Sequence, residues 1–125
     1  MFIIYKKLNN FFNTKKKQKI NNFNLYNKVD HEINIINSIF KVNINSLIDL
    51  RYKYSYFYDY SLNTSKTCPI KMGGESNIDL LFNIVIQLKP KNILETGVAF
   101  GWSSLSILLG TKFNNFGKLI SIDMP

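Results

Sequence analysis

Apolar positions follow a helical spacing between residues 25 and 50. In the first part they recur three and four positions apart, which places them on one face of an amphipathic helix from Leu25 onward: Val29, Ile33, Ile36, Ile39 and Phe40. A second apolar set, from Ile44 to Leu50, predicts another helix that begins at Asn45 or Ser46.

Residues 52–60 carry a tyrosine at every second position. Strict alternation favours a strand, whereas the three-and-four spacing that continues from Leu47 through Arg51 favours a helix, and we predict a helix. We interpret this aromatic stripe as a packing surface rather than a stacking platform. Residues 61–76 are predicted as a loop, because Pro69, the pair Gly73-Gly74 and several small polar residues favour turns.

From residue 77 onward, helical spacing alternates with short apolar runs. The expected elements are a helix from an N-cap at Ser76 or Asn77 to Pro90, a strand at Asn92–Glu95, a helix at about Trp102–Leu109, a polar loop at Gly110–Gly117 and a strand at Lys118–Asp123. The order helix, strand, helix, strand predicts an α/β fold that opens a parallel sheet, preceded by a mostly helical N-terminal segment.

Length and charge divide the chain into three parts. The 125 residues form at most one domain. We expect a basic, flexible arm over 1–24, a helical segment and loop over 25–76, and the α/β part over 77–125. Much of the net charge of +8 lies in the first part, and clustering at a terminus argues against a nucleic-acid surface. An arm that contacts anionic lipid stays an alternative to a ragged terminus.

Cysteine and histidine are too scarce for a metal site. Cys68 and His31 are the single residues of their types, so neither an internal disulfide nor a zinc centre is expected. The first apolar residues, Met1 to Tyr5, are too few for a signal-peptide core or a membrane span. We therefore expect a cytoplasmic protein.

The glycine turn after the first strand carries the most specific signal. Gly101 is followed by Trp102, so the turn lacks the Gly-Lys-Ser/Thr ending of a phosphate-binding P-loop. A dinucleotide fingerprint needs a middle glycine where Ala99 stands. What is present is an acid two residues before Gly97, at the end of a strand, and a second acid at the end of the next strand, Asp123.

The pattern Glu95-x-Gly97-x-x-x-Gly101 resembles motif I of the class I S-adenosylmethionine-dependent methyltransferases. With the run Lys118–Pro125, it looks like a bacterial-type subgroup of that superfamily, over residues 77–125. The resemblance implies a Rossmann-like sheet, S-adenosyl-L-methionine as cofactor and a small-molecule acceptor, such as an oxygen of a sugar or metabolite. The residue in the role of catalytic base is unknown.

The resemblance also implies a role for each site residue. The expected cofactor-binding residues are Glu95, Thr96, Gly97, Gly101, Ser103, Asp123 and Met124. Glu95 would meet the cationic end of the cofactor, Asp123 the ribose hydroxyls, and Met124 the adenine. Ser103 and Ser104 would cap the helix or line the methionine end, and we expect capping. A loop at Gly73-Gly74-Glu75 would fold over the cofactor.

Two alternatives stay open. The chain supplies two strands of a sheet that has seven in the family, so we expect a C-terminally truncated methyltransferase. The alternative from another class is a non-catalytic Rossmann-like fragment or interaction module that binds no cofactor. An NAD-type oxidoreductase is a third interpretation, which Ala99 disfavours. Oligomeric state is not indicated by the sequence.

Overall fold

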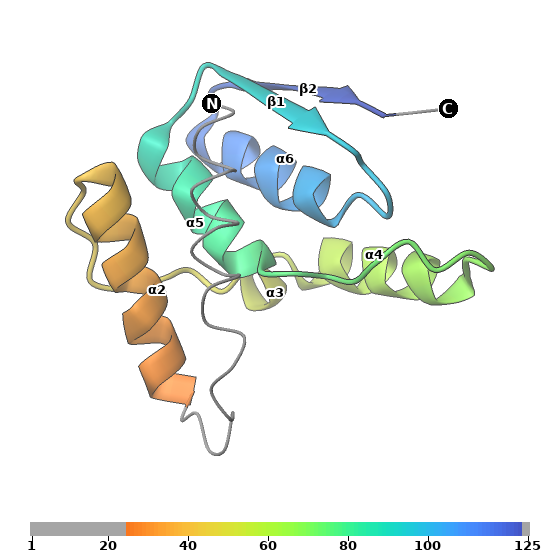
Figure 1. Cartoon of the computed structure of the whole chain (residues 1–125), viewed down its shortest axis with the longest axis horizontal. Helices are drawn as coiled ribbons and strands as arrows, with labels where there is room; N and C mark the ends of the chain where they lie inside the picture. The colour runs from red at the N-terminus through yellow and green to blue at the C-terminus, as the bar shows by residue number, and fades with distance from the viewer. Residues whose placement is uncertain (1–24, 124–125) are drawn as a thin grey trace.

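The computed structural model describes residues 25–123, with side chains from Asp30 onward, and these residues form an α/β structure. The elements follow the order α2 (Leu25–Phe40), α3 (Leu50–Lys53), α4 (Ser55–Thr67), α5 (Ile78–Leu88), β1 (Asn92–Thr96), α6 (Trp102–Asn114) and β2 (Lys118–Ile122). In Figure 1, α5 and α6 lie against one face of the sheet, and α2, α3 and α4 lie farther from it. The predicted basic arm over 1–24 and Met124 lie outside the described residues.

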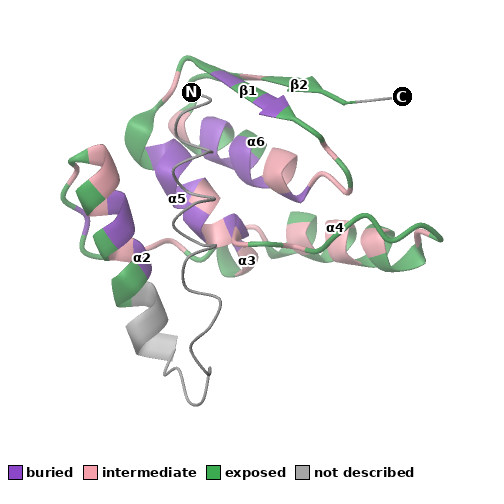
Figure 2. Cartoon of the chain, in the orientation of Figure 1, coloured by how far each residue is buried: buried purple, intermediate pink, exposed green. Residues whose placement is uncertain are grey.

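The two strands are parallel neighbours, as predicted. Their register runs from Asn92 opposite Lys118 to Thr96 opposite Ile122. Because side chains alternate across a strand, Ile93 faces the helices, where it packs with Val85 and Ile107. The opposite face exposes three large apolar side chains, Leu94, Ile120 and Ile122. Figure 2 shows β1 alternating between buried and exposed residues and β2 mostly exposed.

Helix α5 is the centre of the hydrophobic core. Its buried residues contribute to three clusters: Ile78, Phe82 and Ile86 with Leu50, Trp102 and Leu109; Leu80 and Ile84 with Ile36 and Ile44; and Val85 with Ile93 and Ile107. The helix therefore contacts α2 on one side, α6 and the sheet on another, and the segment that enters α3. This accounts for the strongly apolar sequence of α5, because little of its surface is left for solvent.

Both ends of α5 are confirmed as predicted. Asn77 is the N-cap, and its side chain accepts a hydrogen bond from the Leu80 N–H at 3.2 Å. Helix α5 ends at Leu88, and Lys89 adopts a left-handed conformation with φ 45°, one residue before Pro90. A proline there prevents continuation of the helix and leads the chain into β1.

The predicted helix between Ile44 and Leu50 is wrong. Residues 41–49 form neither a helix nor a strand. Instead, the Asn37 side chain pairs with both backbone groups of Ile44, at 2.9 and 3.0 Å, and Asn83 pairs in the same way with Ile48, at 2.9 and 2.8 Å. These amides satisfy backbone groups that a helix would otherwise have paired, so Ile44 is buried and Ile48 half-buried without helical structure.

The tyrosine segment is helical, as predicted, with an interruption at Tyr54 between α3 and α4. Tyr54 and Tyr58 pack against the core, whereas Tyr52, Tyr56 and Tyr60 are exposed. Packing therefore describes only part of the stripe. The predicted loop at 61–76 is wrong over 61–67, because α4 continues to Thr67.

Helices α4 and α6 both extend further along the chain than predicted. In α4, the hydroxyls of Thr64, Ser65 and Thr67 donate to carbonyls three or four residues earlier, so their polar groups are satisfied within the helix. In α6, the predicted stop at Leu109 is wrong, and the helix runs to Asn114. Gly110 lies against Val85, where a β-carbon would come within 2.7 Å of Val85 Cγ1, so this glycine permits close packing of α5 and α6.

Candidate functional site

The glycine turn joins the end of β1 to the start of α6. Gly97, Ala99 and Gly101 all have positive φ, at 77°, 48° and 75°. The N–H of Gly97 donates to the Ile122 carbonyl at 2.9 Å, which ties the start of the turn to β2. A β-carbon at Gly97 or Gly101 would have no atom within 4 Å, so both glycines serve the backbone conformation rather than a close approach. Ala99 holds a left-handed conformation that non-glycine residues seldom adopt.

Glu95 is buried at the end of β1 and accepts hydrogen bonds from three serine hydroxyls. Ser103 donates to Oε1 at 2.5 Å, and Ser104 and Ser121 donate to Oε2 at 2.6 and 2.7 Å. These contacts join β1, the first turn of α6 and β2. A buried carboxylate without such partners would be costly, and three hydroxyl donors remove most of that cost.

The predicted capping role of Ser103 and Ser104 is wrong. The N-cap of α6 is Gly101, in a left-handed conformation, and no side chain caps the helix. Both serines lie within the first turn of α6, and their hydroxyls point to Glu95 instead. A carboxylate two residues before the turn therefore competes successfully for hydroxyls that a sequence pattern would assign to the helix N-terminus.

A cavity of about 320 Å³ lies beside the glycine turn. Three parts of the chain line it: Met72 and residues 74–77 before α5, the α5 residues Ile78, Leu80, Leu81 and Ile84, and Gly97–Phe100 with Trp102 and Ser103. Its lining is mostly apolar, and among the described residues that line it Glu75 is the one with a charged side chain. This size and chemistry lie within the range of small-molecule sites, at the lower end in volume.

The structure brings some of the predicted site residues to this cavity and leaves others outside it. Gly97 and Ser103 line the cavity, together with Gly74 and Glu75 of the loop that we expected beside the cofactor. Glu95 reaches the lining through its hydrogen bond with Ser103. Thr96, Gly101 and Asp123 do not line it, and Asp123 is exposed just after β2.

Sequence reasoning missed an ionic cluster beside the cavity, centred on Arg51. Its Nε and Nη2 donate to Glu75 Oε1 at 2.9 and 2.6 Å, and its Nη1 donates to Asp79 Oδ2 at 2.8 Å. The Tyr58 hydroxyl donates to Glu75 Oε2 at 2.9 Å. The loop before α5, the start of α5 and helices α3 and α4 thus meet at one guanidinium group.

Burial and charge shift the pKa values of this cluster. Burial raises the pKa of Tyr58, and the hydrogen bond with Glu75 raises it further. Burial also raises the pKa of Asp79, with the Leu50 N–H and the Arg51 charge acting against this shift. For Arg51, burial lowers the pKa, but the bond with Glu75 and the charges of Asp79 and Glu75 outweigh it, so the pKa is raised.

One sequence signal pointed to this cluster. Of the 16 basic residues, fifteen are lysines and Arg51 is the single arginine. A guanidinium can hold two carboxylates at fixed angles, which an ammonium group cannot do, so a lone arginine in a lysine-rich chain marks a geometric requirement. The two acidic partners, Glu75 and Asp79, are 24 and 28 residues away, and only the fold brings them together.

The described part of the chain contains no metal-ligand cluster and no membrane-spanning helix. Within residues 25–123, no group of three or more histidine, cysteine, aspartate or glutamate side chains is placed to hold a metal ion. Each helix of the same described part is too short or too polar to cross a bilayer. No family model, curated protein or solved structure matches the chain.

Proposed function

We propose that this chain binds S-adenosyl-L-methionine at the cavity beside the glycine turn and acts as part of a class I methyltransferase. The observation that carries the proposal is the geometry of the Glu95-x-Gly97-x-x-x-Gly101 turn. It leaves the end of a parallel strand, passes through three left-handed residues and lines a cavity large enough to admit part of a nucleoside ligand.

The chemistry of the lining supports a ligand with an apolar body and a cationic end. Leu80, Leu81 and Ile84 provide apolar surface for a flat or aliphatic group. The carboxylates of Glu75 and Glu95 lie at and just behind the lining, the latter through Ser103. Glu75 is already paired with Arg51, whereas Glu95 accepts hydrogen bonds from neutral serine hydroxyls and so keeps a negative charge that favours a nearby cation. S-adenosylmethionine carries an ammonium and a sulfonium.

Four of the predicted residues have a role in this proposal. Ser103 and the backbone of Gly97 would contact the methionine end, and Glu95 would act through Ser103. Asp123, at the end of β2, would hold the ribose hydroxyls. When bound, the cofactor supplies an electrophilic methyl group, and the protein contributes mainly by positioning an acceptor in line with it. A small-molecule oxygen, on a sugar or metabolite, is the proposed acceptor.

We also propose that β1 and β2 open a larger Rossmann-like sheet. Each strand has one neighbour among the described residues, so each keeps one edge available for a further strand. The apolar side chains Leu94, Ile120 and Ile122 are exposed on the face opposite α5 and α6. In doubly wound α/β folds, helices cover both faces of the sheet. Further strands at these two edges, and helices on the exposed face, would complete the sheet of the enzyme.

A second candidate is a Rossmann-like module that binds no cofactor. It is favoured by one observation: Glu95 already accepts three hydrogen bonds within the chain and does not itself line the cavity. Under this interpretation, Glu95 stabilises the turn and does not bind a ligand.

Calorimetric titration separates the two candidates. S-adenosylmethionine and S-adenosylhomocysteine would be titrated into the wild-type chain and into Glu95→Ala, Glu95→Gln and Asp123→Ala variants, with NADH as a control ligand. The methyltransferase proposal expects binding of the first two ligands, loss of affinity in each variant, and no preference for NADH. Asp123 is exposed, so its replacement tests the site without disturbing the core.

A matched control guards against a general effect of charge. Asp59→Ala removes an exposed carboxylate on α4, and Asp59 does not line the cavity. Its affinity for S-adenosylhomocysteine should equal that of the wild type. Absence of binding by a wild-type protein with native far-UV circular dichroism would support the module that binds no cofactor.

A further inference from the structure

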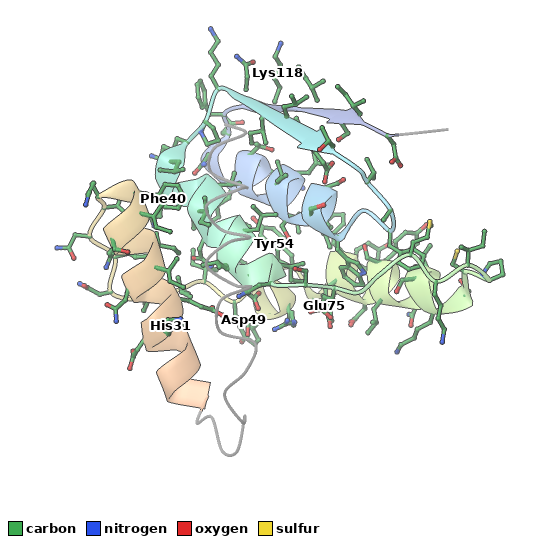
Figure 3. All side chains as sticks on the ribbon, viewed as in Figure 1. His31, Phe40, Asp49, Tyr54, Glu75 and Lys118 are labelled. Carbon is green, nitrogen blue, oxygen red and sulfur yellow. The ribbon has the colours of Figure 1, made fainter. Side chains whose placement is uncertain are left out.

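Arg51 connects two walls of the cavity. Glu75, which lines the cavity, receives two of the guanidinium hydrogen bonds, and Asp79 in the first turn of α5 receives the third. Figure 3 shows Glu75 on the connection that leads past α3 and α4 into α5. This connection contains Gly73 and Gly74, a β-carbon at either of which would meet no atom within 4 Å. The loop therefore has little packing of its own at these glycines, and ionic contacts hold it nearby.

The cluster also contacts the start of α6. The Arg51 guanidinium lies 5.7 Å from the centroid of the Tyr58 ring. The Tyr58 ring in turn lies 5.8 Å from the ring of Trp102, which lines the cavity and follows the glycine turn directly. Through Glu75 and Tyr58, one side chain thus contacts both the loop before α5 and the aromatic group at the end of the turn.

We propose that Arg51 is a positioning residue, which holds the loop over residues 72–77 as a wall of the cavity and so prepares the site for its ligand. The part about the ligand rests on the proposed function. Arg51 itself does not line the cavity and acts through Glu75. Lysine cannot replace it, because one ammonium group cannot hold both carboxylates at the observed angles.

The first test measures the loop without any ligand. Amide hydrogen exchange over residues 72–81 would be compared between the wild type and Arg51→Met. This range includes the N–H groups of Leu80 and Leu81, which donate to Asn77 at the end of the loop. In the variant these two amides should exchange about tenfold faster, because opening of the loop no longer breaks charge-assisted hydrogen bonds. Trp102 is the single tryptophan, so its fluorescence and its quenching by acrylamide report on the same cavity, and quenching should increase.

The second test measures affinity. S-adenosylhomocysteine should bind Arg51→Met about fivefold more weakly than the wild type, and Arg51→Lys should restore little of the loss. Lys53→Met is the matched control: Lys53 lies two residues further along α3, is exposed, and contacts the Phe113 ring instead of an acid of this cluster. Exchange and affinity of this control should equal those of the wild type.

A double-mutant cycle separates positioning from general stability. In a Glu75→Gln background, Arg51→Met should change loop exchange and affinity much less than in the wild type, because the carboxylate through which Arg51 acts is gone. An equal effect in both backgrounds would overturn the proposal, as would loop exchange within about twofold of the wild type in Arg51→Met and Arg51→Lys. If Arg51→Met does not fold, Arg51→Lys, which keeps the charge, decides by the same measurements.

The outcomes also separate this proposal from the proposed function. A wild-type protein that binds no S-adenosylhomocysteine contradicts the methyltransferase proposal, while loop exchange and Trp102 quenching still decide whether Arg51 positions residues 72–77. Binding by the wild type together with unchanged loop exchange in both Arg51 variants would retain the cofactor site and reject the role of Arg51.

Discussion

Ser121 of β2 donates a hydrogen bond of 2.7 Å to Glu95 of β1, its register partner across the parallel pair. Ser121 is exposed, whereas Glu95 is buried, so the bond lies where the edge of the sheet meets solvent. Removal of the hydroxyl in Ser121→Ala should lower the free energy of unfolding by about 1 kcal/mol, because water can replace part of the lost bond. Urea unfolding followed by circular dichroism measures the change.

The same experiment with Ser104→Ala completes this prediction. Ser104 donates to the same Glu95 oxygen as Ser121, so the two losses should be more than additive in the double variant, which leaves that oxygen without either hydroxyl. Strict additivity would show that the two hydrogen bonds act independently.

Asn83 should be one of the most sensitive polar residues of the core. Its side chain is 1% exposed, bonds both backbone groups of Ile48 and also donates to the Asp79 carbonyl at 2.8 Å. Asn83→Leu leaves those groups without their partners, and we expect a loss of about 3 kcal/mol in the free energy of unfolding. Asn37→Leu, which disturbs a similar but less buried pair with Ile44, should cost about 1 kcal/mol. Equal losses at the two sites would contradict this ranking.

Gly110→Ala should destabilise the protein, against the usual effect in a helix. Alanine normally stabilises a helix interior relative to glycine by about 1 kcal/mol. Here the new β-carbon would lie 2.7 Å from Val85 Cγ1, so α5 and α6 must separate, and the net loss should be about 1–2 kcal/mol. Thermal unfolding measures it. Val85→Ala would keep the Val85 β-carbon, which lies 2.8 Å from the new one, so the control background is Val85→Gly, which removes both close atoms. In that background the cost of Gly110→Ala should largely disappear.

Tyr58 should make stability depend on pH in the alkaline range. Burial, and then the hydrogen bond with Glu75, raise the pKa of its phenol above the ordinary value of 10.0. A raised folded-state pKa gives a contribution to stability that is complete below the unfolded pKa and is lost as pH rises through the folded-state pKa. Between about pH 9 and pH 12, the wild type should therefore lose more stability than Tyr58→Phe. Parallel profiles of unfolding free energy against pH would contradict this.

The α/β part could be predicted because local signals and long-range packing agree there. Asn77 caps α5, Pro90 follows its end, and the short apolar runs at Asn92 and Lys118 become neighbouring parallel strands. Two element boundaries failed where a side chain distant in the sequence decides the conformation. Ile48 lies outside any helix because Asn83, 35 residues later, pairs with its backbone. Helix α6 continues through Gly110 because that glycine packs against Val85.

The candidate site could be predicted in its backbone but not in its polar contacts. The turn from Gly97 to Gly101 was located by its spacing, and its positive φ values agree with the choice of glycine. The partners of Glu95 could not be derived, since Ser121 is 26 residues away and reaches it only through the strand register. The partners of Arg51 could not be predicted either, because Glu75 and Asp79 approach it only in the fold. The presence of a single arginine among fifteen lysines did indicate that this position needs a guanidinium group.

The open face of the sheet has a consequence for how copies of the chain behave in concentrated solution. Leu94, Ile120 and Ile122 favour contact between molecules, while the net charge of +8 keeps the molecules apart. Added salt shortens the range of the repulsion, to about 3 Å at 1 M, without weakening the attraction between apolar surfaces. The colloidal stability of the protein should therefore fall as ionic strength rises, whereas many proteins become more soluble when salt is added. Ile120→Lys, which places a charge on the apolar face, should reverse that trend.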